Sequence, residues 1–459
     1  MNKVIQEYLA GRKPEKYRSM AVFCITIALG ATGICFAEKP DVSIDFSGYT
    51  SFQAGEIVKG RYGGNGAPDT LDHRWQEKLL GGFNLSAVVN KRLKIDFNPE
   101  AAISQAVYDY SPQTNFVNDL ESMHAYYYFY LNQMQATYSF GNLENPFLKV
   151  STGYFPFTYN RDIKSLGEYL FRATAYPGYI VNDFASVYKR LLGLHVQSEP
   201  VQNLKLDLLF TSEMQAPVGD WTPSLLASYA MGGQKNHPLV EVGAGVSFTR
   251  LFSVDSRLTS PHYINNEVVT QADTFSTANG DSIVGDTTYF TFSATKVMAR
   301  FSLDIKQFFG APWIFGDEDL KLYGEACILG IKDYPVYYDS ILRRIPIMVG
   351  FNIPAFKLLD VLSVEVEWYD NKFANDYTNT YYGLHVTPTP VISNYEPKPF
   401  PLYWSVFARR SITHGIQLLA EVTRNHYYTQ TKYPNYQDRC EATPSHGDWM
   451  FIGRVQYSF

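Results

Sequence analysis

One segment of the sequence, from Pro156 to Ala185, concentrates charged side chains of both signs between aromatic ones. Among its charged residues are Arg161, Asp162, Lys164, Glu168 and Arg172. Fixed guanidinium, ammonium and carboxylate groups attract ions and polar molecules and orient them, which is electrostatic rather than covalent chemistry. What such a cluster does therefore depends on the elements that hold it.

Charged residues also alternate with apolar ones along several stretches of the chain. From Val361 to Trp368, leucine, valine and tryptophan share one face while serine and glutamate share the other. If the apolar faces point outward, the interior receives seven cations and eight anions. They are Lys94, Lys205, Arg300, Lys306, Lys321, Arg409 and Arg454, with Asp96, Glu100, Asp207, Asp304, Glu325, Glu365, Glu367 and Glu421. Opposite charges across a channel order water and admit polar solutes, with weak choice of ion sign. For each single residue, a structural salt bridge in the wall is the alternative.

The sequence contains no catalytic or metal-binding pattern that its context supports. Gly280 to Ile283 resembles the nucleophile block of GDSL-type esterases, but the polar run Ser276 to Asn279 stands where that family places a buried strand. We therefore predict a turn there. The nine histidines include no pair at metal-ligand spacing, and no glycine-rich phosphate loop is present. We expect no catalytic residue, no metal and no cofactor, and the net charge of −6 argues against nucleic acid as a partner.

Alternation of apolar and polar residues, the signature of a strand with two unlike faces, recurs throughout the chain. It predicts an all-β fold, a transmembrane antiparallel β-barrel of about 16 strands with short periplasmic turns and long outer loops. The predicted strands span 42–58, 79–89, 92–106, 121–140, 147–155, 186–197, 203–212, 224–232, 239–251, 287–308, 320–331, 343–353, 360–371, 402–411, 415–427 and 447–459. After Ala37 no apolar run is long enough to cross a membrane as a helix.

Two of these ranges, 121–140 and 287–308, are long for one simple strand. The second changes the phase of its alternation between Lys296 and Phe301, which predicts a bulge or an extra hairpin. Counts of fourteen or eighteen strands therefore stay open.

The first 37 residues differ from the rest of the chain. Basic residues outweigh acidic ones up to Arg18, and an apolar run follows from Met20 to Ala37, which is typical of a signal peptide. We predict cleavage after Ala37, which leaves a barrel over 38–459. Removing five positive and two negative charges takes the net charge from −6 to −9. A lipoprotein cut before Cys35 and an uncleaved anchor helix are the alternatives.

The last strand carries its aromatic residues on one face. Trp449, Phe451, Tyr457 and the terminal Phe459 share one parity. This end resembles that of bacterial outer-membrane barrels, and the resemblance implies recognition by the barrel-assembly machinery. An ordinary last strand of a soluble sandwich is the alternative.

The stretch from Gly153 to Phe157 and the polar-aromatic segment after it look like general or phosphate-selective porins. The sequence lacks the lumenal ladders of Lys and Arg expected of the phosphate-selective type, so the resemblance does not extend to anion selectivity. Ser165 to Glu168 fits a capping box and predicts a short helix. We expect the 156–185 segment to fold into the lumen and narrow it, with Arg161 and Arg172 facing a carboxylate-bearing wall. An exposed loop with solvated charges is the alternative.

These patterns together predict an outer-membrane porin that passes small hydrophilic solutes or ions by passive diffusion and is not an enzyme. Its expected partners are outer-membrane lipid, the barrel-assembly machinery and the solutes themselves. The sequence leaves open whether barrels form homotrimers, because every lipid-facing wall is apolar. A structural or adhesive barrel with a blocked lumen and a barrel-borne hydrolase are the alternatives.

Overall fold

The computed structural model describes most of the chain after its first 40 residues. The described residues are 41–59, 61–64, 67–70, 73–106, 125–172, 189–212, 221–234, 237–249, 251–252, 275–276, 282–283, 294–309, 312–331, 341–369, 401–413, 415–424 and 447–459. The predicted signal peptide, 1–37, lies outside them.

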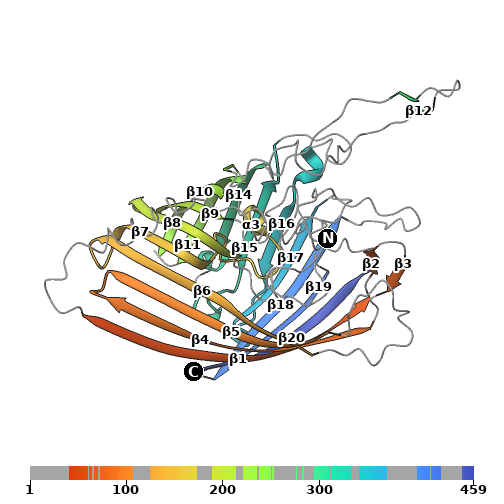
Figure 1. Ribbon diagram of the computed structural model, residues 1–459, viewed down its shortest axis with the longest axis horizontal. Helices are drawn as coiled ribbons and strands as arrows, with labels where there is room; N and C mark the ends of the chain where they lie inside the picture. Colours follow the sequence, from red (N-terminus) through yellow and green to blue (C-terminus); the bar gives the residue numbers. More distant parts are fainter. Residues whose placement is uncertain are drawn as a thin grey trace, which may run out of the picture.

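Sixteen strands within the described residues close into one antiparallel barrel (Figure 1). They are β1 (Val42–Lys59), β4 (Arg74–Val89), β5 (Leu93–Ala106), β6 (Ala125–Gly141), β7 (Pro146–Phe157), β8 (Lys189–Val201), β9 (Leu204–Ser212), β10 (Trp221–Gln234), β11 (His237–Thr249), β14 (Ala294–Asp304), β15 (Lys321–Ile328), β16 (Ile347–Asn352), β17 (Val361–Trp368), β18 (Leu402–Thr413), β19 (Ile416–Arg424) and β20 (Trp449–Ser458). Each strand pairs with its neighbours in the chain, and β20 pairs with β1. The predicted sixteen-stranded barrel is confirmed.

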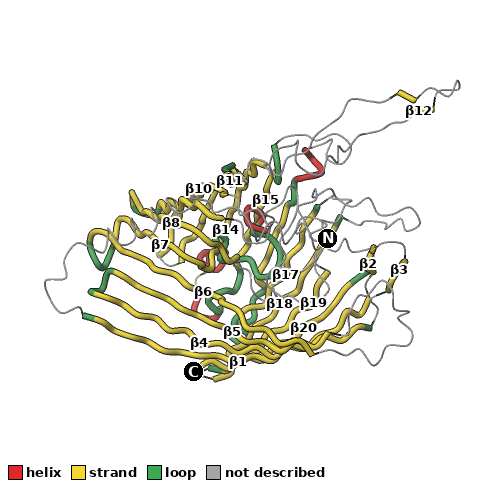
Figure 2. The backbone as a smooth tube through the Cα atoms, in the orientation of Figure 1, coloured by secondary structure: helices red, strands yellow, loops and turns green. Residues whose placement is uncertain are grey.

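The remaining described elements are short. They are the hairpins β2 (Arg61–Gly64) with β3 (Ala67–Thr70) and β12 (Phe275–Ser276) with β13 (Ser282–Ile283), the helix α3 (Tyr169–Arg172), and the 3-10 turns η1 (Ile305–Phe308), η2 (Pro312–Ile314) and η3 (Ile341–Arg344). Strands dominate the described backbone (Figure 2). Within the described part of the chain, no helix is both long and apolar enough to cross a membrane.

The alternation in sequence becomes an inside and an outside of the barrel. In β1, Phe46 and Phe52 point outward and are 64% and 48% exposed, whereas Ser51 and Gln53 point inward and are buried. Because successive side chains of a strand point to opposite faces, a period of two produces an apolar exterior and a polar interior.

The two ends of the barrel differ in their connections. At the end where β20 finishes, which we call the turn end, β4 joins β5 through residues 90–92, and β8 joins β9 through 202–203. Asn90 and Lys91 adopt the left-handed conformation, with φ of 50° and 56°, as tight hairpins often require. At the opposite end, the loop end, the links include 158–188, 250–293 and 369–401.

The strands of the wall are shortest beside two long connections of the turn end. β15, β16 and β17 have 8, 6 and 8 residues, against 18 in β1. Beside them the turn-end connections 305–320 and 353–360 are joined by the buried carboxylate of Asp319. It accepts hydrogen bonds from the backbone N–H groups of Gly316, Ala355 and Phe356, at 2.8, 3.1 and 3.1 Å.

The two long predicted strands resolve differently. β6 contains an irregularity, because its pairing with β5 shifts between Asn98 and Pro99. The range 287–308 becomes β14 followed by η1, and its described part pairs without a break to β11 and β15. The predicted bulge or hairpin is therefore wrong within those residues. The change of phase arises because the apolar Met298 points into the barrel, where it is buried.

Asp319 provides a test of the turn-end joint. Asp319→Ala leaves three backbone N–H groups without their acceptor, so we expect it to lower the free energy of unfolding by about 2–4 kcal/mol. The measurement is urea unfolding of the refolded barrel. Asp317→Ala is the matched control, since Asp317 is exposed and the hydrogen bond from Lys306 goes to its backbone carbonyl. Equal stability of the two variants would contradict this role.

Candidate functional site: a segment held inside the barrel

Residues 158–172, which we call the inserted segment, leave the end of β7 and run inside the barrel. Ile163, Leu166 and Tyr169 are at most 1% exposed. α3, the last part of the segment, contacts β11, β14 and β15 and lies within the ring of strands (Figure 1). The charged segment is thus placed against the interior wall.

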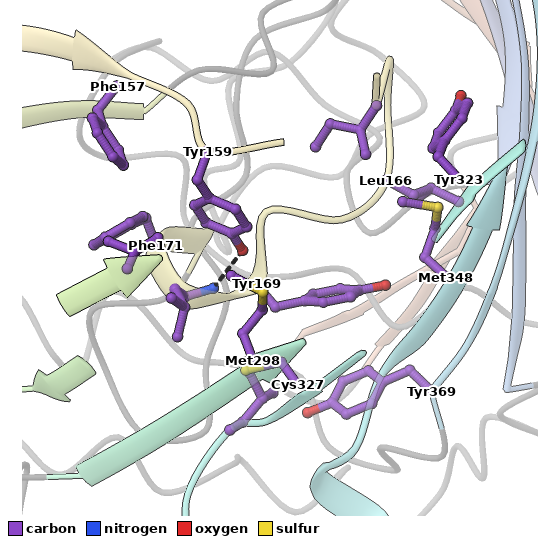
Figure 3. Packing of buried hydrophobic residues seen from close by; sticks show 14 of the residues in the cluster. Phe157, Tyr159, Leu166, Tyr169, Phe171, Met298, Tyr323, Cys327, Met348 and Tyr369 are labelled. Carbon is purple, nitrogen blue, oxygen red and sulfur yellow. Dashed lines mark hydrogen bonds between the residues drawn. The ribbon is translucent and has the colours of Figure 1, made fainter. Parts of the chain in front are cut away.

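The segment packs through an apolar cluster that fills this side of the interior. Leu166, Tyr169 and Phe171 of the segment share this cluster with Phe157 at the end of β7 and with inward-facing side chains of the wall such as Met298 (Figure 3). The other labelled members are Tyr159, Tyr323, Cys327, Met348 and Tyr369. The Tyr159 hydroxyl also accepts a hydrogen bond from the backbone N–H of Leu170, at 3.1 Å, which closes the segment on itself. Apolar residues at inward positions, which break the polar-in pattern, are explained by this packing.

Glu365 on β17 holds the middle of the segment. Its carboxylate accepts hydrogen bonds from the backbone N–H groups of Lys164, Ser165 and Leu166, at 2.5, 2.8 and 2.8 Å. The Tyr323 hydroxyl donates to the same carboxylate at 2.8 Å. Buried backbone donors need acceptors, and an ionised carboxylate is a strong one. Glu365 therefore replaces the partner strand that this stretch lacks.

Glu325 on β15 plays the same part at the two ends of the segment. It accepts hydrogen bonds from the Tyr159 hydroxyl at 2.5 Å and the Asn160 side-chain amide at 3.1 Å. It also accepts from the backbone N–H groups of Glu168 and Tyr169, at 3.2 and 2.8 Å. Burial and the negative charges of Glu325 and Glu168 raise the pKa of Tyr159 well above its ordinary value, so its hydroxyl stays protonated and donates.

Two more wall carboxylates complete these attachments. Glu367 accepts from the Tyr169 hydroxyl at 2.7 Å, and Glu421 on β19 accepts from the Ser165 hydroxyl at 2.5 Å. The inserted segment is therefore hydrogen-bonded to β15, β17 and β19.

Ion pairs tie the segment to the turn end. Lys164 lies 3.3 Å from Glu318, and Lys321 lies 3.3 Å from both Asp162 and Glu318. Burial opposes ionisation of Glu318, but the charges of Lys164 and Lys321 outweigh it and lower its pKa to about 2. This carboxylate is ionised throughout the physiological range.

The structure places the five predicted charges of the segment in different surroundings. Asp162 and Lys164 form the ion pairs above, and Glu168 accepts from the backbone N–H groups of Tyr159 and Asn160. Arg161 is exposed within the barrel interior. The side chain of Arg172 lies outside the described residues. The wall carboxylates Glu325 and Glu365 are thus met chiefly by backbone N–H groups, whereas the sequence suggested the two arginines.

The capping-box prediction is wrong. Glu168 has a φ of 60°, in the left-handed region, and the helix α3 begins only at Tyr169. The Glu168 carboxylate turns back to Thr158, Tyr159 and Asn160 instead of capping a helix at Ser165. A side chain that satisfies three donors of its own segment competes with local helix formation.

The other predicted wall charges lie away from the segment attachments and mostly have partners on the wall. Lys94 pairs with Asp96 at 2.9 Å, Lys205 with Asp207 at 3.0 Å, and Asp304 with Lys306 at 3.6 Å. Arg300 pairs with Glu241, Glu100 accepts from the Tyr49 hydroxyl, and Arg454 donates to Gln53 at 2.6 Å. Arg409 lies opposite Val361 and Leu419 in the ladder.

Several polar side chains of the interior were missed by the sequence analysis. Lys78 is buried on β4, but the predicted strand began one residue later, at 79. Lys296 is buried at the point where the alternation changes phase. His195 on β8 donates to Asp207 at 2.8 Å and stacks on Phe155. A lone histidine in a polar alternating strand carried no signal that distinguishes such a pair.

Comparison with known proteins adds little to this picture. No protein-family model and no curated protein matches the chain. Similar solved structures are porins: a triple mutant of the Rhodopseudomonas blastica porin (9% identity, TM-score 0.41) and Salmonella typhi OmpF in complex with daunomycin (11% identity, TM-score 0.44). The matches cover 91% of this chain, and 100% and 97% of those chains. The assignment of the fold therefore comes from the strand pairing of this chain and not from these similarities.

Glu365→Gln tests how the segment is held. The amide presents donors where backbone donors must be accepted, so we expect the amide hydrogens of Lys164, Ser165 and Leu166 to exchange about tenfold faster or more. Hydrogen exchange read by mass spectrometry measures this. Glu241→Gln is the matched control, because that interior carboxylate pairs with the Arg300 side chain and not with the segment. Equal exchange in the two variants would refute the attachment.

Glu318 predicts a pH dependence of stability. Its pKa of about 2 lies below the ordinary 4.5, so its stabilising contribution is complete above pH 4.5 and is lost as the pH falls towards 2. We expect the unfolding free energy of wild type to exceed that of Glu318→Gln by a constant amount above pH 4.5. About 3 kcal/mol of that difference should disappear on acidification to pH 2. Urea unfolding at a series of pH values measures the difference, and one that stays constant down to pH 2 would disprove the coupling.

Proposed function

We propose that this chain is an outer-membrane porin through which small hydrophilic solutes and ions diffuse passively. A sixteen-stranded barrel is wide enough to leave an aqueous channel unless its interior is filled. The inserted segment is attached along β15, β17 and β19, and a polar wall faces the interior on β1, β4, β5 and β20. The observation that carries the proposal is that a charge on this second wall meets solvent, since the Lys94 side chain is 53% exposed although its partner Asp96 is buried.

The inserted segment is proposed as the constriction of this channel. Asp162, Lys164 and Glu168 hold it in place through the contacts above. Arg161 is exposed, and we assign it the role of meeting solutes together with Arg172. Mixed charge on the opposite wall, in pairs such as Lys94 with Asp96, favours polar solutes and chooses weakly between cations and anions.

Location and assembly belong to the same proposal. The apolar exterior suits lipid, and the N-terminal 37 residues suit export. In β20 the aromatic residues Trp449, Phe451 and Tyr457 share the outward parity, and Phe459 follows, hydrogen-bonded to Gly48 at 2.8 Å. We propose that this strand is the signal read by the barrel-assembly machinery and that the barrels can associate as homotrimers.

Two other functions have specific observations to weigh. The apolar cluster around the inserted segment fills part of the interior, which favours a structural barrel with a blocked lumen as the second candidate. For a hydrolase, Ser151 lies directly across the ladder from His195, which is bonded to Asp207. The Ser151 hydroxyl, however, is hydrogen-bonded to Thr137 at 2.9 Å. The serine, histidine and aspartate of a catalytic triad are therefore neighbours, but the hydrogen bond from the nucleophile to its base is not formed.

Planar-bilayer recordings of the refolded chain from Glu38 onward test the proposal. We expect steady current steps with weak ion selectivity. Replacing residues 159–172 by a short Gly-Ser linker should raise the conductance about twofold or more, because it widens the narrowest part. Replacing the β2–β3 hairpin, residues 61–70, by a similar linker is the control and should leave the conductance unchanged.

The outcomes separate the candidates. A correctly folded, heat-modifiable barrel that passes no current would overturn the porin and favour the blocked barrel. Current that is unaffected by replacement of 159–172 would remove the constriction role and leave the channel standing.

A further inference from the structure

A cavity of about 240 Å³ lies between the inserted segment and the wall formed by β8, β9, β10, β11 and β14. Asn203 in the β8–β9 turn lines it, so it lies towards the turn end. Tyr159, Leu226 and Met298 supply an apolar part of its lining, and charged side chains supply the rest. Glu365 on β17 and Glu421 on β19, which hold the segment, are not part of this wall.

Most charges that line the cavity are already matched within the protein. Lys205 pairs with Asp207, which also accepts from His195, and Arg300 pairs with Glu241. These contacts leave one lining cation and one lining anion to account for.

Arg161 and Glu199 are that cation and that anion. Both line the cavity and both are exposed. Among the described residues, no ion pair or hydrogen bond of either side chain is found. The guanidinium comes from the inserted segment and the carboxylate from β8, so opposite charges stand on separate walls of one cavity.

We propose that this cavity binds a small zwitterionic solute, such as an amino acid. Its carboxylate would pair with Arg161, for which the planar guanidinium is well suited, and its ammonium group with Glu199. Leu226 and Met298 would contact a small apolar side chain. The inference rests on the proposed function, because the solute must enter the lumen to reach the cavity.

Size and charge argue against other ligand classes. Pockets for drug-sized ligands measure about 300–1,000 Å³, so this cavity suits a smaller solute. A simple anion would pair with Arg161 but would be repelled by Glu199. A simple cation would pair with Glu199 but would be repelled by Arg161. A zwitterion neutralises both groups at once.

The test compares L-alanine with lactamide, its uncharged isomer of identical composition. In ligand-observed NMR titrations of the refolded full chain, we expect alanine to bind with a Kd of about 1–10 mM and lactamide to show no saturable binding. Arg161→Gln and Glu199→Gln should each weaken alanine binding about fivefold or more. Both side chains are exposed, so both variants should fold, which heat modifiability checks.

Lys149→Gln, combined with Glu144→Gln, is the matched control. These substitutions remove one charge of each sign near the same end of the barrel, from Lys149 on β7 and from Glu144 in the β6–β7 turn. Neither residue lines the cavity, so alanine binding should be unchanged. Lactamide binding equal to alanine, insensitivity to Arg161→Gln, or acetate binding as tightly as alanine would each overturn the zwitterion site. Current recorded from the same preparation keeps the two proposals apart. A barrel that conducts current but does not bind alanine would refute only the zwitterion site. A folded barrel that conducts no current would refute the proposed porin function.

Discussion

A buried backbone N–H group must find an acceptor, and this requirement shapes both the barrel and what lies inside it. The strands meet it by pairing all the way round, with β20 closing on β1. No strand pairs with the inserted segment, so most of its hydrogen-bonded N–H groups meet the requirement with carboxylates. Glu365 and Glu325 accept five of them at 2.5–3.2 Å. The position of the segment therefore depends on acidic residues at fixed points of the wall.

This arrangement sets two groups of interior charges apart. Glu325, Glu365, Glu367 and Glu421 have their charge directed at the segment, where hydrogen bonds stabilise it. Lys94, Asp96 and Arg454 belong to the wall that the segment does not cover. Of these two groups, only the second faces the space through which we propose that solutes pass. Counting all inward charges from the sequence therefore overstates the field in that space.

The fold was largely predictable because a period of two is a local property. Each barrel strand was marked by its own alternation, and the differences lie at strand ends, as for Lys78. The failures involve long-range contacts. Met298 seemed out of phase because the segment that buries it comes from residues far away in sequence. The helix was misplaced because Glu168 binds Tyr159 and Asn160 instead of capping. No local pattern indicates that Glu365 on β17 will accept from Lys164, Ser165 and Leu166, since that pairing exists only after the barrel has closed.

The inserted segment also lies beside the shortest strands of the barrel wall. β16 has only 6 residues, and its ladders with β15 and β17 are correspondingly short. Gly350 on β16 has no side chain, and a Cβ there would lie 2.3 Å from the Tyr323 ring. The ring can therefore approach the wall closely while its hydroxyl reaches Glu365. Because Glu325, Glu365 and Glu421 stand on alternate strands, one segment bound to all three joins β15, β17 and β19 across the strands between them. The element proposed to narrow the channel is thus also a brace for the shortest part of the barrel, and a segment with both roles is expected to be rigid.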